Sequence, residues 1–296
     1  MSALPIDPAA SPVGLLVVDK PSGPTSHDVV AQVRRVTGTR KVGHAGTLDP
    51  LATGVVVVAL GRATRLLRYV QEASKDYTAI LRLGIATDTL DAQGQVLSTQ
   101  EMPITREQFE LALDGFRGSI VQVPPMVSAL KMGGRRLYEL ARAGEEVERK
   151  PRTVDIHSLT LISFAPGDFP VAVIEVGCSK GTYIRVLADD IARALGGRAH
   201  LEGLRRTRVD GFRVEQALSL DALDMWRDSL LPPAAAVAGM ECLPASAEQM
   251  QRVSQGRPLD TTPGTGPLAI TDPDGRLLAV YRLTSSGLAR AEVVLS

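Results

Sequence analysis

Residues 41–60 read KVGHAGTLDPLATGVVVVAL, a glycine-rich loop that runs directly into an apolar segment of strand length. The three glycines of the loop let the backbone turn sharply and approach a ligand closely. Asp49 precedes a proline, which favours extended backbone angles and one presentation of its carboxylate. Asp-Pro pairs most often only begin turns, so a turn is the competing interpretation. Phosphate-binding patterns such as GxGxxG are absent, which leaves Asp49 and the nearby His44 as the candidate reactive groups.

Apolar periodicity on both sides of this loop predicts strands and helices in mixed order. The first helix is expected to begin at Ser26 as its cap, and a Thr105/Gln108 capping pair opens another. Strict alternation of strands and helices is absent and several strands are joined as hairpins, so the sequence predicts an α+β fold with a largely antiparallel mixed sheet flanked by helices. The expected strands are 14–18, 55–60, 77–85, 120–123, 154–164, 171–177 and 204–209.

Composition shifts divide the chain into regions. A Pro/Ala-rich segment at 231–240 is typical of a linker, and short strands at 268–271, 277–283 and 291–295 predict a small β-rich C-terminal domain. We therefore expect a disordered tail over 1–12, a large domain over 13–240 and a small one over 241–296. A charged excursion within about 124–152 interrupts the large domain.

Composition excludes several classes of protein. The chain has 296 residues, of which 44% are hydrophobic and 22% charged, as expected for a globular protein with a core. Apolar runs are too short to span a bilayer, and the N-terminus lacks the pattern of a secretory signal. Cys178 and Cys242 have no metal-ligand spacing, which favours a reducing cytoplasm and no structural metal. We expect a cytoplasmic protein without a membrane partner.

The 33 basic residues equal the 33 acidic ones, but the charge is segregated along the chain. Basic residues outnumber acidic ones in four segments, whereas two other segments are acidic. A chain of zero net charge can therefore present one basic face to a nucleic acid. The basic segments are 20–46, 61–82, 128–152 and 180–213, and the acidic ones are 85–110 and 214–250.

A few further side chains are candidates for the site. Arg185 follows Gly181-Thr-Tyr-Ile at a predicted helix start, and its guanidinium can pair with a carboxylate such as Asp49, although a solvated arginine is the simpler interpretation. Tyr77 and Tyr183 can stack on a flat base or simply pack. Asp88 and Asp91 are interpreted mainly as hairpin-turn residues. The four histidines form no HExxH pair, so metal catalysis is not expected.

Five blocks in order over roughly 14–213 resemble the motifs of the TruB-type tRNA pseudouridine synthases. The first is GLLVVDKPSGPTSH at 14–27, and the second is the loop at 41–54 around Asp49. KDY at 75–77, followed by LG at 83–84 and TDT at 87–89, is similar to the next block. GTYIR at 181–185 and LRRT at 204–207 resemble the last two.

The resemblance implies a pseudouridine synthase fold and the isomerisation of uridine 55, in the T-arm loop of tRNA, without cofactor or metal. It makes Asp49 the group that attacks the target nucleoside, by addition to the sugar or through a glycal-like intermediate. It pairs Arg185 with Asp49, and stacks Tyr77 on the flipped uracil with a part in removing the C5 proton. His44 would fill the space of the extruded nucleotide, and the pocket would be lined by Lys20, Tyr183 and Leu204.

The resemblance extends to the excursion and the C-terminal region. The excursion is similar to a family insertion that closes over the T-arm, which implies RNA contacts by Arg135, Arg136 and Arg142. Val127 stands where the family commonly has tyrosine, a departure that concerns the insertion and not the chemistry. The C-terminal segment resembles a small PUA-like RNA-binding domain.

Other functions compete with this assignment. A non-catalytic tRNA-binding or tRNA-folding protein on the same scaffold would have no need for Asp49, Tyr77 and Arg185 together. An N-glycosidase would be expected to carry an acid/base carboxylate pair. A guide-RNA-dependent relative of the dyskerin type is disfavoured by the compact C-terminal region without a lysine-rich tail. We therefore expect an isomerase with tRNA as its partner and no required protein partner.

Overall fold

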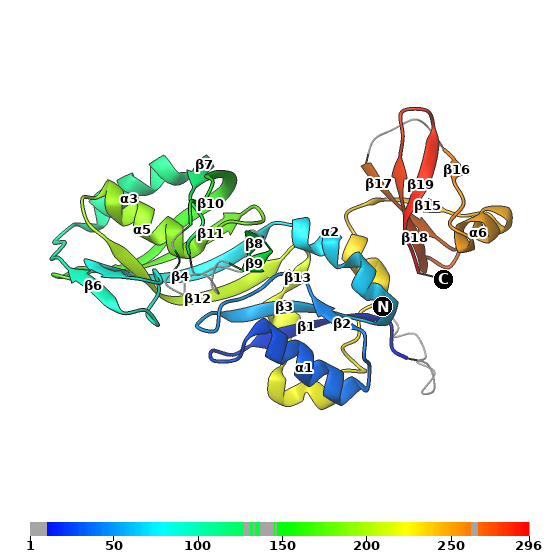
Figure 1. Cartoon of the computed structure of the whole chain (residues 1–296), viewed down its shortest axis with the longest axis horizontal. Coiled ribbons are helices and arrows are strands. Elements are labelled where there is room, and N and C mark those ends of the chain that lie inside the picture. The colour runs from blue at the N-terminus through cyan, green and yellow to red at the C-terminus, as the bar shows by residue number, and fades with distance from the viewer. Residues whose placement is uncertain are drawn as a thin grey trace.

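The computed structural model describes residues 11–126, 131–132, 134–136, 145, 147–261 and 266–295. Over these residues the chain forms a large mixed sheet with helices packed on it and a smaller sheet in the C-terminal region (Figure 1). The α+β prediction is therefore confirmed, including the β-rich C-terminal part.

The large sheet has the strand order β14-β1-β3-β12-β4-β11-β10-β7, with β2 also paired to β3 and β13 to β12. Within the described part of this sheet only the pairs β1–β14 and β3–β12 are parallel, so the sheet is largely antiparallel as predicted. The strands are β1 (Gly14–Lys20), β2 (Val42–His44), β3 (Thr53–Leu60), β4 (Lys75–Leu83), β7 (Gly118–Gln122), β10 (Arg152–Ala165), β11 (Val171–Cys178), β12 (Ala199–Val209), β13 (Phe212–Arg213) and β14 (Leu218–Ser219).

Alternating side chains of β1 and β3 enter two different cores, because successive residues of a strand point to opposite faces. On one face Leu16 and Val56 pack in a cluster with α1 (Ser26–Thr37), α3 (Arg106–Leu113) and α5 (Ile184–Ala194). On the other face Leu15 and Val55 pack with shorter helices. These are η1 (Gly61–Leu66), α2 (Leu67–Glu72) and η5 (Pro233–Val237). The remaining 3₁₀ turns are η2 (Asp114–Phe116), η3 (Val214–Gln216) and η4 (Leu220–Met225).

The start of α1 corrects one prediction. Its N-cap is Thr25 and not Ser26, because Thr25 and Asp28 exchange the two hydrogen bonds of a capping box. Ser26 is the first helical residue, and it is buried. Its hydroxyl accepts a 2.8 Å hydrogen bond from the backbone N–H of Leu48, so the helix start is tied to the loop that carries Asp49.

A hairpin of β5 (Ile85–Thr87) and β6 (Val96–Thr99) leaves the main sheet after β4. The predicted turn is present, since the N–H of Gly94 donates to the carbonyl of Asp91 at 3.2 Å. The turn also lies against β12, because Ala92 N–H donates to Leu201 O and Leu201 N–H to Leu90 O. This contact brings the turn to the middle of the large sheet.

The C-terminal region forms a five-stranded sheet in the order β15-β17-β18-β19-β16, and it packs beside η1 and α2 (Figure 1). Four of its buried side chains belong to the same cluster as Val55: Ala269, Leu277, Val280 and Val293. The elements are β15 (Glu241–Pro244), α6 (Ala247–Ser254), β16 (Leu259–Asp260), β17 (Gly266–Thr271), β18 (Leu277–Leu283) and β19 (Leu288–Val294).

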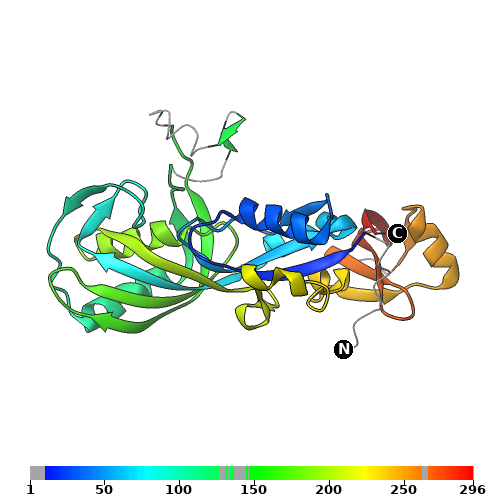
Figure 2. The ribbon, with the colours of Figure 1, turned by 90° about the horizontal axis from the view of Figure 1, so that it is seen from below.

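The charged excursion is described only in part. Two short strands, β8 (Lys131–Met132) and β9 (Arg135–Arg136), pair with each other and stand away from the body of the large sheet (Figure 2). Val127 and Arg142 lie outside the described residues, as do the first ten residues of the predicted tail. In the part of the chain that the structure covers, each helix is too short or too polar to cross a membrane.

Candidate active site

The loop that carries Asp49 connects β2 to β3 and is anchored on several sides. The N–H of Gly23 donates to Pro50 O at 2.9 Å, and the N–H of Ala52 donates to Asp49 O at 3.0 Å. The second bond closes a turn over 49–52, so the Asp-Pro pair begins a turn as the simpler interpretation required. The same turn leaves the Asp49 side chain 42% exposed, and thus accessible to a substrate.

Gly54 is a glycine for a steric reason at the end of this loop. Its φ of +103° lies in a region that other residues rarely adopt, and a Cβ here would overlap the backbone of Arg206 on β12. Close approach of the two strands therefore requires glycine, and it brings the loop against β12.

Arg185 lies in the first turn of α5 with only 4% of its side chain exposed. Its Nε is 3.0 Å from Oδ2 of Asp49, so a buried cation pairs with the half-exposed carboxylate. The start of the helix is held by Gln122, whose side-chain amide donates to Tyr183 O and accepts from Tyr183 N–H. The loop and the helix thus meet at the pair that the resemblance implied.

Asp91 is a second carboxylate on Arg185, and sequence reasoning missed it. Its Oδ2 is 3.3 Å from Nη1 of Arg185, which also donates to Thr89 O at 2.8 Å, and its side chain is 8% exposed. The Oδ1 atom accepts from the Thr89 hydroxyl and from Gln93 N–H. In the sequence these features are indistinguishable from an ordinary hairpin turn. Only the placement of the turn on β12 makes Asp91 a partner of the site.

Tyr77 lies on β4 and is buried. Burial raises the pKa of its phenol, an effect that the positive charge of Arg206 and its hydrogen bond to the hydroxyl partly offset. The charge of Asp49 acts on the same group in the raising direction, which places the phenol within electrostatic reach of the carboxylate.

Lys20 lies fully buried at the end of β1, below the loop. Its ammonium donates to the carbonyls of Pro21, Pro24 and Pro50 at 2.9, 2.9 and 3.2 Å. Burial lowers the pKa of Lys20 to about 8, and the nearby Asp49 charge opposes this shift. All three ammonium hydrogens are therefore directed at backbone oxygens, two in the turn at 21–24 and one, Pro50 O, in the loop, so Lys20 links the two segments.

The other residues of the expected pocket lie on three elements. His44, in β2, is half-buried with its ring edge-on to His27 at 5.2 Å, and burial lowers the pKa of its imidazole. The ring of Tyr183 lies 4.5 Å from the guanidinium carbon of Arg152, a cation–π contact at the base of the excursion. Leu204 is partly buried on β12, and its carbonyl accepts from the Thr53 hydroxyl at 3.4 Å.

The arginines expected to contact RNA are only partly described. Arg135 is exposed and pairs with Glu145 at 2.9 Å, Arg136 belongs to β9, and Arg142 lies outside the described residues. Part of the second basic segment serves another purpose. Arg62 and Arg65 donate to the carbonyls of Leu295 and Val294, and Arg68 pairs with Glu292 on β19. These three arginines bind the C-terminal sheet.

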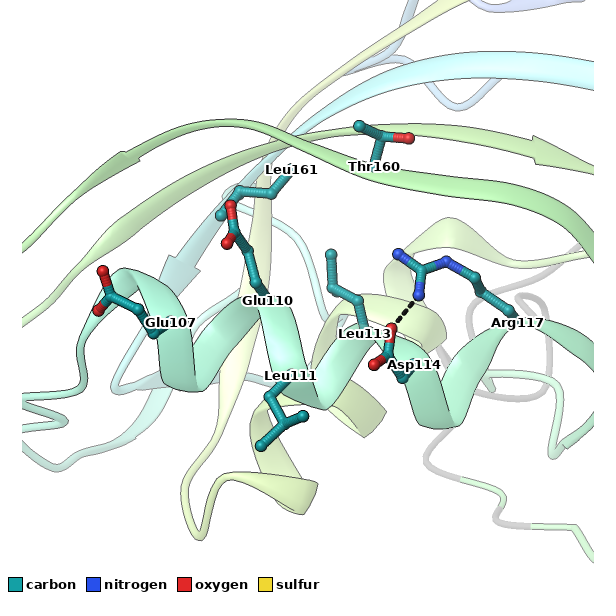
Figure 3. Close-up of a pocket in the computed structure, with 8 residues that line it drawn as sticks. All are labelled: Glu107, Glu110, Leu111, Leu113, Asp114, Arg117, Thr160 and Leu161. Atoms are coloured by element: carbon teal, nitrogen blue, oxygen red, sulfur yellow. Dashed lines mark hydrogen bonds and ion pairs between the residues drawn. The ribbon is translucent and has the colours of Figure 1, made fainter.

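A separate hollow of about 440 Å³ lies between α3 and β10 (Figure 3). Its polar lining includes the carboxylates of Glu107, Glu110 and Asp114, the last of which pairs with Arg117. None of the predicted site residues lines it. Its acidic lining would repel a phosphate backbone, so the hollow is no part of the candidate site. Across the described ranges, His, Cys, Asp and Glu form no group of three that could hold a metal ion.

Family profiles match a continuous stretch of residues 34–233. The profile described as "TruB family pseudouridylate synthase (N terminal domain)" matches residues 34–184, which include Asp49 and Tyr77. The profile described as "tRNA pseudouridylate synthase B C-terminal domain" continues over residues 185–233. The chain belongs to the TruB family. The junction of the two matches falls at Arg185, inside the site.

Similar proteins and structures agree with this membership. A protein of Symbiobacterium thermophilum named tRNA pseudouridine synthase B is 52% identical over 84% of this chain and 84% of its own. A protein of the same name from Thermobifida fusca is 46% identical over 95% of this chain and 98% of its own. Among solved structures, a chain of a Cbf5-Nop10-Gar1 complex superposes with a TM-score of 0.73 at 27% identity, covering 95% of this TruB-family chain and 83% of that one.

Proposed function

We propose that this TruB-family protein is a cytoplasmic tRNA pseudouridine synthase that isomerises uridine 55 in the T-arm loop, without a cofactor. The observation that carries the proposal is the half-exposed carboxylate of Asp49 on the buried guanidinium of Arg185, in a chain of this family. Tyr77 is the aromatic residue whose phenol senses the charge of Asp49. A carboxylate, its cationic partner and a neighbouring aromatic ring suit nucleophilic chemistry on a flat base.

In the proposed reaction the bond between C1′ of the ribose and N1 of uracil breaks, and a bond between C1′ and C5 replaces it. Asp49 either adds to C1′ or removes a proton from the sugar to give a glycal-like intermediate. The freed uracil turns within the pocket, and the proton on C5 leaves after the new bond has formed. Tyr77 would stack on the base and assist this proton transfer, whereas Arg185 would hold the Asp49 carboxylate in position.

The target uridine would have to leave the stacked loop of the tRNA before it can reach Asp49. Such flipping costs a few kcal/mol, which stacking and hydrogen bonds within the pocket offset. His44 would occupy the vacated space at the mouth of the loop, and Tyr183 and Leu204 would line the pocket. Lys20 would act from below, by holding the loop through Pro50 O.

A tRNA-binding or tRNA-folding role without chemistry is the alternative. Binding alone gives no reason to bury Arg185 against two carboxylates, one of them half-exposed. Taking an arginine and an aspartate out of water costs free energy. An RNA-binding protein would not need this arrangement, so it favours an enzyme.

The experiment that tests the proposal uses an unmodified tRNA transcript and the purified full chain. We expect pseudouridine to be formed at position 55 and at no other uridine, as mapped by chemical labelling and reverse-transcription stops. A transcript with cytidine at position 55 is the matched control and should remain unmodified. Tight binding of the transcript without any pseudouridine would contradict the proposed activity and favour the binding role instead.

The excursion gives a prediction of its own. Replacing all three of Arg135, Arg136 and Arg142 by glutamine should reduce the salt dependence of tRNA affinity. The plot of log K against log salt has a negative slope, and each lost phosphate contact makes it shallower by about 0.7–0.9. The measurement is a series of filter-binding titrations between low and moderate salt. Arg117→Gln, at the acidic hollow beside α3, should leave the slope unchanged. An unchanged slope in the triple variant would remove the excursion from the binding face.

A further inference from the structure

Arg206 is the largest fully buried side chain of the described structure, with 1% of the residue exposed. An arginine at such depth is normally paired with a carboxylate, since an isolated buried charge is very unfavourable. Within the described residues, the ion pairs of this region involve Arg185, Arg205 and Arg208 but not Arg206. The guanidinium instead donates to three backbone oxygens and lies at the Tyr77 hydroxyl.

The register of the sheet explains where this side chain lies. Arg206 is on β12, between β3 and β4, and its Cα faces Gly54 on one neighbour and Tyr77 on the other. Directly opposed residues in an antiparallel pair project from the same face, with Cβ atoms about 5 Å apart. The guanidinium therefore lies beside the phenol of Tyr77 and below the loop that ends at Gly54.

Three hydrogen bonds join Arg206 to both ends of the Asp49 loop. Its Nε donates to Val55 O at 2.7 Å, while Nη2 and Nη1 donate to Gly46 O at 3.3 Å and Thr47 O at 3.4 Å. The planar guanidinium can serve these separate oxygens at once, which the single ammonium of a lysine cannot do with the same geometry. One side chain thus closes the loop from beneath.

Two further cations share this buried region. Lys20 and Lys75 are both buried, and burial together with the charge of Arg206 lowers the pKa of each to about 8. The ammonium of Lys75 donates to Gln71 O and Ala73 O, just before β4. Lys20, Lys75 and Arg206 together give the region below the loop a positive potential. Burying three positive charges costs folding free energy, and the packing of their side chains does not explain why that cost is met.

We propose that Arg206 is a second positioning residue of the reaction, which acts on the Tyr77 phenol and on the loop that presents Asp49. The inference rests on the proposed synthase activity and assigns different positioning roles to Arg185 and Arg206. Arg185 holds the Asp49 carboxylate, and Arg206 holds the backbone of its loop and supplies positive charge to the phenol. This arrangement favours an oxygen on Tyr77 that can accept the C5 proton at the stage when the base is rearomatised.

The ionisable groups that act on Tyr77 come from three packed elements. Burial raises the pKa of the phenol, Arg206 on β12 lowers it, and Cys178 on β11 and Asp49 in the loop raise it. Arg206 is therefore the stabilising partner of the phenolate among these groups. Its removal should raise the pKa further.

The test compares Arg206→Met, which keeps the side-chain length without charge, with Arg206→Lys. Single-turnover pseudouridine formation at saturating enzyme should fall about 100-fold in Arg206→Met, as a small misplacement of the reacting groups can produce. Arg206→Lys should recover part of the rate, and tRNA affinity should change little in both variants. Arg205→Met is the matched control, because this neighbouring arginine points to Asp19 at the surface and should keep the wild-type rate.

A second measurement needs no tRNA and no activity. Trifluorotyrosine placed at position 77 has a more acidic phenol, and ¹⁹F NMR follows its titration. We expect the midpoint to rise by about 1 pH unit or more in Arg206→Met. It should stay close to the wild-type midpoint in Arg205→Met. A merely structural role would lower the unfolding temperature without moving this midpoint.

The outcomes separate the two proposals. Absence of pseudouridine with the wild-type protein overturns the proposed function, whereas the ¹⁹F titration still decides whether Arg206 acts on Tyr77. An active wild type together with an Arg206→Met variant that matches Arg205→Met in rate and midpoint overturns only this inference. If Arg206→Met does not fold, Arg206→Lys decides, since the loss of the forked hydrogen bonds should lower its rate below that of Arg205→Met.

Discussion

Asparagine in place of Asp49 is expected to abolish pseudouridine formation, with a loss of at least about 10⁴-fold in the single-turnover rate. The amide keeps the size and the turn over 49–52 but cannot act as a nucleophile or base. It also loses the charge that pairs with Arg185 at 3.0 Å. Binding of tRNA should persist, because contacts of basic side chains with phosphates, and not a carboxylate, dominate the affinity of proteins for nucleic acids.

Asp19→Asn is the matched control for this variant. Asp19 is also a partly exposed aspartate paired with an arginine, Arg205, at 2.7 Å, but it lies outside the candidate site. The control should retain the wild-type rate. Turnover of Asp49→Asn near that of the control would refute the assignment of Asp49 as the attacking group.

Methionine in place of Arg185 is expected to have the second-largest effect. It removes the anchor of Asp49 and leaves the buried Asp91 carboxylate without its cation, so we expect a rate loss of roughly 10³-fold. Removing one partner of a buried pair typically also costs about 3 kcal/mol of stability. Chemical denaturation measures this second effect in the absence of tRNA.

Asp91→Asn should show a smaller loss than Arg185→Met, because an amide oxygen can still accept from the guanidinium. The matched control is Asp88→Asn in the same turn, whose side chain accepts only a backbone hydrogen bond from Gln95 in the described structure. Equal rates for the two asparagine variants would show that Asp91 is a turn residue and no more. A graded series from Arg185→Met through Asp91→Asn to Asp88→Asn supports the two-carboxylate arrangement.

Much of the fold follows from local pattern in the sequence. The apolar run 55–60 and the alternation within 77–85 correspond to β3 and β4, and the Thr105/Gln108 pair caps α3 as predicted. The same patterns missed α6. Its eight residues are mostly polar, and only Val253 among them is buried. Local pattern also favoured Ser26 over Thr25, although both are good capping residues. The capping box of Thr25 with Asp28 decides for Thr25, and the Ser26 hydroxyl binds Leu48 N–H instead.

The candidate site could be proposed from sequence where its residues lie in one short segment, as in the loop around Asp49. It was not predictable where distant residues meet through strand register. Asp91 reaches Arg185 because its turn lies on β12, and Arg206 is buried while the adjacent Arg205 is not. The sequence gives no reason to treat the two arginines of LRRT differently. Only the pairing of β12 with β3 and β4 shows which of them is buried.

Net charge also required the structure for its interpretation. The neutral chain was predicted to gather its basic segments on one face, yet Arg62, Arg65 and Arg68 bind the C-terminal sheet. Their contribution to an RNA-binding surface is therefore smaller than the count for residues 61–82 indicates. The charge of a segment indicates how many arginines could contact RNA, whereas the fold determines which of them contact the protein instead.

The contact between α2 and β19 has a consequence for the order of folding. Tyr69 donates a hydrogen bond to Glu292, which is 223 positions later in the chain, and Val55 shares its core with Val280 and Val293. While the ribosome synthesises the protein, η1 and α2 can cover part of the face that carries Val55, but the core on that face stays incomplete until these late residues emerge. Exposed apolar sheet surface in such an intermediate promotes aggregation. This face is therefore the part of the large sheet whose core is completed last during synthesis.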